Sequence, residues 1–119
     1  SFLTVTCKYP RKDSIALMRD IWDLLSERSN QFWWCPDGLY LPVRAFIACE
    51  PHKFSNNLHA HAIIAGGEKY RIPINRALNS RFGRSRVELC RSMGDVAGYC
   101  SKYVTKWGDG DNYNYFGSW

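Results

Sequence analysis

The segment LHAHAIIAG, residues 58–66, decides the fold that we predict for this chain. It has the apolar character of a buried strand, and so has VRAFIACE, residues 43–50, which ends on a carboxylate. The loop PHKFSNN between them is rich in turn residues, so the two segments are expected to form a hairpin of two long central strands. Because side chains alternate along a strand, His59 and His61 lie on the same face of this predicted hairpin.

The segments on either side of the hairpin predict a sheet with helices packed on it. Apolar residues recur with a period of two in some of these segments and with helical spacing in others. The expected elements are a strand at residues 2–8, a helix from residue 13 or 14 to about residue 29, a helix at residues 75–82, a strand at residues 87–90 and a last helix at residues 95–106. The tail, residues 108–119, is expected to be a loop or a hinge. The predicted fold class is therefore α+β, with a central antiparallel sheet and packed helices.

The last predicted helix, DVAGYCSKYVTK, carries an unusual set of polar side chains. At about 100° per residue, two phenols and two ammonium groups fall on one helix face, beside an apolar stripe that can pack inward. These residues are Tyr99, Lys102, Tyr103 and Lys106. We interpret this face as the place of the chemistry, although a solvated face with half-buried tyrosine stems would have the same pattern.

The two histidines of the central strand form a candidate metal site. Imidazoles of His59 and His61 on one side of a strand can bind one divalent ion, and Glu50 ends the adjacent strand, where it can add an oxygen ligand. Such a mixed site suits Mn²⁺ or Mg²⁺ when a phosphate completes the coordination shell. A lone His-x-His pattern is also common among incidental histidines, and His52, in the loop beside Glu50, is an alternative ligand.

The totals for the whole chain restrict the class of protein. A length of 119 residues is typical of one domain, so we predict a single domain over residues 1–119, excised from a longer protein. No apolar run reaches the about 18 residues that a membrane helix requires. Five cysteines without Cys-x-x-Cys spacing predict buried thiols in an intracellular, reducing compartment. The net charge of +5 favours a polyanionic partner.

Three segments together resemble the HUH endonucleases, a family that includes rolling-circle replication initiators and related transposases. FLTVTC is similar to the first motif of that family, LHAHAII to its metal-binding motif and GYCSKYVTK to its tyrosine motif, and the three occur in the order that the family has. The resemblance covers most of the chain. It implies the HUH or Rep fold, a palm similar to that of RNA-recognition-motif domains.

The resemblance also implies an activity. Members of the family nick and rejoin single-stranded DNA at a specific sequence, in a metal-dependent transesterification that initiates rolling-circle replication. A tyrosine becomes joined to the 5′ phosphate, and a free 3′-OH is left. Tyr99 matches the nucleophile of both the two-tyrosine and the single-tyrosine branches, whereas Tyr103 is either a second nucleophile or a wall of the site. Lys102 is expected to neutralise charge on the phosphate or phenolate, and Lys106 to contact the DNA backbone.

By the same resemblance, His59, His61 and Glu50 are the expected ligands of Mn²⁺ or Mg²⁺, with His52 competing with Glu50 as the third. Several arginines lie between the histidine strand and the tyrosine helix and predict a basic flank beside the site. Those that we expect to contact DNA are Arg81, Arg84 and Arg86.

Other functions fit parts of the sequence. An HUH transposase catalytic domain would carry the same motifs, since the neighbouring domain separates it from a replication initiator. A non-catalytic module that binds single-stranded nucleic acid would explain the charge and the aromatic residues, but it leaves the histidines and tyrosines without a role. A two-histidine phosphodiesterase is disfavoured, because it needs a second histidine motif that this chain lacks.

Overall fold

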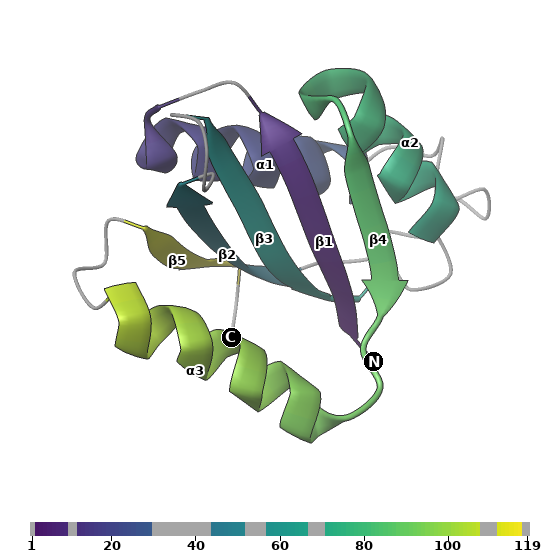
Figure 1. Cartoon of the computed structure of the whole chain (residues 1–119). Coiled ribbons are helices and arrows are strands. Elements are labelled where there is room, and N and C mark those ends of the chain that lie inside the picture. The colour runs from purple at the N-terminus through teal and green to yellow at the C-terminus, as the bar shows by residue number, and fades with distance from the viewer. Residues whose placement is uncertain are drawn as a thin grey trace.

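The computed structural model describes residues 2–9, 12–29, 44–51, 57–66, 71–107 and 112–117. The described residues form five strands and three helices (Figure 1). In chain order the elements are β1 (Phe2–Tyr9), α1 (Ser14–Ser29), β2 (Arg44–Pro51), β3 (Leu58–Ala65), α2 (Arg71–Phe82), β4 (Ser85–Leu89), α3 (Met93–Trp107) and β5 (Tyr113–Phe116). An α+β fold with a central antiparallel sheet is thus confirmed.

The described strands form one antiparallel sheet in the order β4-β1-β3-β2-β5. The predicted hairpin provides two adjacent strands near its middle, since β2 pairs with β3 along their whole length. In this register Glu50 lies opposite His59, and Ala48 lies opposite His61. On the other side of β3, β1 places Thr6 opposite His61. Residues directly opposite one another share a face, so these side chains lie on one face of the sheet.

The main apolar core lies on the other face of the sheet, under α1 and α2 (Figure 1). Helix α1 begins as predicted, because the Asp13 carboxylate accepts a hydrogen bond from the Ala16 backbone N–H at 3.1 Å. Helix α2 begins at Arg71, four residues before the predicted start at residue 75. Pro73 falls in its first turn, where a missing N–H removes no helical hydrogen bond. The helix residues that this core buries include Leu17, Ile21, Leu25, Ile74, Leu78 and Phe82.

Two buried cysteines belong to the same core. Cys7 and Cys49 have no exposed surface, and burial raises the pKa of each thiol from 9.0 to about 12. Both are free thiols, as the prediction of buried, unpaired cysteines requires. They therefore act as small apolar residues in the packing.

Helix α3 packs on the histidine face of the sheet. Phe46 and Ala48 of β2 are fully buried on that face, and they are covered by Tyr99 and Cys100 of α3 and by Tyr113 of β5. In Figure 1 α3 lies apart from α1 and α2, which occupy the opposite side. The fold therefore brings the predicted tyrosine helix to the same side of the sheet as the predicted metal ligands.

The expectation that residues 108–119 form a loop or hinge is wrong for β5. Residues 113–116 pair with β2 as an edge strand, with Tyr115 opposite Phe46. The aromatic residues explain the pairing, because the Tyr115 ring lies 4.9 Å from the Phe46 ring between centroids, and Phe116 stacks on Trp22 of α1 at 5.5 Å. Glycine and asparagine around this segment hide its alternating pattern in the sequence.

Candidate active site

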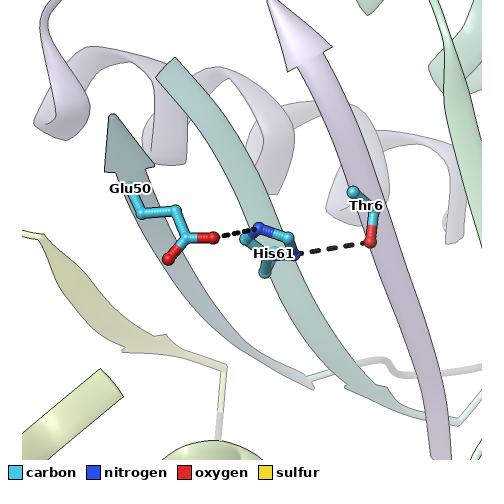
Figure 2. Close-up of polar contacts among 3 residues, drawn as sticks. All are labelled: Thr6, Glu50 and His61. Atoms are coloured by element: carbon cyan, nitrogen blue, oxygen red, sulfur yellow. Dashed lines mark hydrogen bonds and ion pairs between the residues drawn. The ribbon is translucent and has the colours of Figure 1, made fainter. Parts of the chain in front are cut away.

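A chain of polar contacts joins Glu50, His61 and Thr6 across three neighbouring strands (Figure 2). Nε2 of His61 lies 3.0 Å from Oε1 of Glu50, and Nδ1 of His61 lies 3.4 Å from Oγ1 of Thr6. Both nitrogens of the His61 ring therefore have a polar partner. The side chains of His61 and Glu50 are 15% and 22% exposed, so a ligand can still reach the pair.

His59 lies on the same face, two residues before His61, as the alternation of the strand predicts. Its ring centroid is 6.2 Å from that of His61, and the two planes are inclined by 58°. Within the part of the chain that the structure describes, no three His, Cys, Asp or Glu side chains are gathered closely enough to hold a metal ion. The structure thus brings two of the predicted ligands, Glu50 and His61, into direct contact, with His59 beside them.

Helix α3 contributes Tyr99 to the same place. Its ring meets the His61 ring edge-on, with centroids 6.4 Å apart and planes inclined by 67°. The helix begins as its predicted cap requires, because the Ser92 hydroxyl accepts a hydrogen bond from the Asp95 N–H at 3.1 Å. The hydroxyl oxygen of Tyr99 is buried. Lys102, one helical turn further on, is close enough for its charge to lower the pKa of His61.

The surroundings keep His61 neutral at pH 7. Burial lowers its pKa below the ordinary value of 6.5, because a charged imidazolium loses hydration there. The Glu50 carboxylate opposes this by its charge and its hydrogen bond, whereas His59 and Lys102 lower the pKa further. A neutral imidazole has a lone pair available for a metal ion, so the environment favours the form that a metal ligand requires.

Several predicted residues fall outside what the structure describes. Tyr103 and Lys106 belong to α3, but their side chains lie outside the described part, as does His52. Their roles remain predictions. Arg81 is described, and it is an exposed residue in the last turn of α2, the helix that packs on the opposite face.

A basic groove lies beside the histidines. It has a volume of about 550 Å³ and is lined by Thr6, Lys8, Arg84, Ser85 and Arg86. Arg84 and Arg86 are predicted DNA contacts, whereas Lys8 is one that the sequence reasoning missed. The signal was present, because a period of two from Thr6 puts Lys8 on the histidine face, and it lies opposite His59 in the sheet. Arg86 forms an ion pair with Glu88 on the same strand.

Comparison with known families identifies the class of protein to which this site belongs. Residues 1–108 match the family described as replication-associated protein ORF2. The chain belongs to this family. The match extends over every element of the candidate site, from Thr6 on β1 to Lys102 on α3. Comparisons with curated proteins and with solved structures gave no match.

Membership of the replication-associated family supports a role in replication initiation and implies that the chain binds DNA. The Rep-like part of the predicted resemblance is thereby confirmed. None of the described helices is long and apolar enough to cross a membrane. The basic groove and the cluster of Glu50, His61 and Tyr99 lie on one face of the sheet, where this replication-associated protein has room for a DNA strand.

Proposed function

We propose that the chain is an HUH endonuclease domain that nicks and rejoins single-stranded DNA, with Tyr99 as the nucleophile. The observation that carries the proposal is the edge-on contact of Tyr99 with His61, which itself contacts Glu50 at 3.0 Å. In a replication-associated protein, a phenol beside an imidazole–carboxylate pair supports covalent catalysis on a phosphodiester. The proposed activity initiates rolling-circle replication.

The donor set fits a hard divalent ion. Glu50, His61 and His59 offer one oxygen and two nitrogen donors, which suit Mn²⁺ or Mg²⁺ in a shell completed by phosphate oxygens. The 3.0 Å between Nε2 of His61 and Oε1 of Glu50 is close to the about 3.0 Å edge of an octahedron with bonds of about 2.1 Å. Binding requires the His59 ring to join this pair. The ion, when bound, polarises the scissile phosphate and stabilises its developing charge.

The residues of the chain divide the reaction between them. The Tyr99 phenol gives up its proton, and its oxygen forms a bond to phosphorus as the bond from phosphorus to the 3′ oxygen breaks. The departing oxygen takes up a proton and becomes a free 3′-OH, and the reverse reaction rejoins the strand. Lys102, one turn along the helix, neutralises charge on the phosphate or phenolate. Because the Tyr99 hydroxyl is buried, the incoming DNA has to expose it.

Tyr103 and Lys106 extend the same proposal along α3. Four residues after Tyr99, Tyr103 lies on a similar side of the helix axis and would accept the strand as a second nucleophile or form a wall of the site. Lys106 would contact the DNA backbone. A transposase would use the same residues for the same transesterification, so the proposed chemistry does not depend on which biological process the parent protein serves.

The proposed path of the DNA runs from the basic groove to the histidines. Thr6 lines the groove and contacts His61, so the two regions are continuous across β1 and β3. Lys8 and Arg84 bring exposed positive charge to the groove, and Arg86 brings a third guanidinium paired with Glu88. Cations that meet phosphates release counterions, and this makes binding dependent on salt. Arg81 would contact a strand that continues past α2.

Lys8→Ala and Arg84→Ala are each expected to weaken binding of a single-stranded oligonucleotide several-fold. Each should also lower the slope of log affinity against log salt by about 0.7, the value for one lost phosphate contact on single strands. Fluorescence anisotropy at several salt concentrations measures both. Arg76→Ala is the matched control, because Arg76 is an exposed arginine on α2 and does not line the groove. An equal effect of all three variants would contradict the proposed path.

A second candidate, a non-catalytic module that binds single-stranded DNA, is favoured by the buried Tyr99 hydroxyl. The two are separated by incubating the protein with a randomised single-stranded oligonucleotide pool and Mn²⁺ or EDTA. The nickase cleaves with Mn²⁺ and stops with EDTA, while DNA remains bound. Binding without cleavage under both conditions, with the pool shown by sequencing to be diverse, would support the module instead.

A further inference from the structure

Thr6 is placed to control the orientation of the His61 ring. It lies opposite His61 in the pairing of β1 with β3, and its hydroxyl is 3.4 Å from Nδ1 of the ring (Figure 2). The far ring nitrogen, Nε2, faces Glu50 at 3.0 Å. The imidazole is thus held between a hydroxyl from one neighbouring strand and a carboxylate from the other.

A hydroxyl can serve this ring in either protonation pattern, because it both donates and accepts hydrogen bonds. When Glu50 is ionised it can only accept, so the neutral His61 ring donates its Nε2–H and its bare Nδ1 accepts from the Thr6 O–H. A metal ion on Nε2 takes the place of that proton. The proton of the neutral ring then resides on Nδ1, which donates to Oγ1 of Thr6.

We propose that Thr6 is a positioning residue that holds His61 in both tautomers and thereby sets its affinity for a divalent cation. The inference rests on the metal site of the proposed function. A side chain without this reversible hydroxyl would leave Nδ1–H without its partner on β1 in the metal-bound state. Partners of this kind typically change metal affinity by about 10- to 100-fold.

Two substitutions of Thr6 separate the role of its hydroxyl from that of its bulk. Thr6→Val keeps the shape and removes the hydroxyl, whereas Thr6→Ser keeps the hydroxyl and removes a methyl group. Thr4→Val is the matched control, since Thr4 lies on the same strand and face, and its hydroxyl donates to the Glu88 carbonyl instead. Mn²⁺ alone is titrated into each full-length variant, and unbound Mn²⁺ is counted by electron paramagnetic resonance. We expect about 10-fold weaker binding for Thr6→Val and binding within about threefold of wild type for the other two.

The reverse order, with tight binding by Thr6→Val and weak binding by Thr6→Ser, would show a packing role and overturn the inference. Wild-type affinity in all variants would also overturn it. If the wild-type protein fails to bind Mn²⁺, the proposed metal site fails, and the contact is tested in the metal-free protein. There the ¹⁵N resonance of His61 Nδ1, at a pH where the ring is neutral, should move in Thr6→Val and stay in place in Thr6→Ser. An unmoved resonance in Thr6→Val would refute the positioning role independently of the metal.

Discussion

Tyr99→Phe is expected to reduce the nicking of single-stranded DNA by at least about 1,000-fold, because the substitution removes the oxygen that attacks phosphorus. The phenylalanine ring keeps the edge-on contact with His61, so the site should keep its shape. Loss of one hydroxyl is expected to change the free energy of unfolding by about 1 kcal/mol. Cleavage is measured on a labelled oligonucleotide with Mn²⁺, and stability by thermal denaturation.

Tyr113→Phe is the matched control for this substitution. Tyr113 packs against the same buried pair, Phe46 and Ala48, but it comes from β5. We expect it to retain the rate of the wild-type enzyme. Tyr103→Phe tests the other tyrosine of the helix. If Tyr103→Phe abolished the first nick and Tyr99→Phe did not, the roles assigned to the two tyrosines would be reversed.

His61→Ala is expected to slow nicking by about 100- to 1,000-fold, since a metal ligand supplies several kcal/mol of transition-state stabilisation. The variant also leaves the Glu50 carboxylate without its hydrogen bond at 3.0 Å. Binding of single-stranded DNA should change little, because the cations of the groove are intact. Affinity for Mn²⁺, cleavage and DNA binding are measured on the same preparation.

His59→Ala provides the comparison at the neighbouring ligand. It removes the second imidazole but leaves the Glu50–His61 pair in place. We expect a loss of cleavage in this variant too, with the fold checked by circular dichroism. Wild-type rates with Mn²⁺ in either histidine variant would contradict the metal hypothesis and leave Tyr99 to be explained by another mechanism.

Much of the fold follows from local patterns in the sequence. The hairpin of β2 and β3, the helix capped by Asp13 and the helix capped by Ser92 are found where periodicity and capping predict them. The edge strand β5 is not, because it is a short segment within a glycine- and asparagine-rich tail. Its stability comes from aromatic contacts with Phe46 and Trp22, which are distant in sequence. Tertiary packing of this kind leaves a weak local signal.

The candidate site divides in the same way. Alternation along one strand places His59 and His61 together, and a carboxylate at the end of the adjacent strand comes within reach. The roles of Thr6 and Lys8 depend on the pairing of β1 with β3, and the groove depends on the pairing of β1 with β4. A sequence does not state which strands become neighbours, so these residues become visible only in the assembled sheet.

The measurement that tests the central claim most directly is the site of covalent attachment to DNA. The protein is incubated with the single-stranded pool and Mn²⁺, boiled in SDS, digested with protease and nuclease, and its peptides are sequenced by mass spectrometry. The account predicts a nucleotide joined through its 5′ phosphate to Tyr99. Attachment at a residue outside α3, or cleavage of the oligonucleotide with no protein-linked product at all, would contradict it.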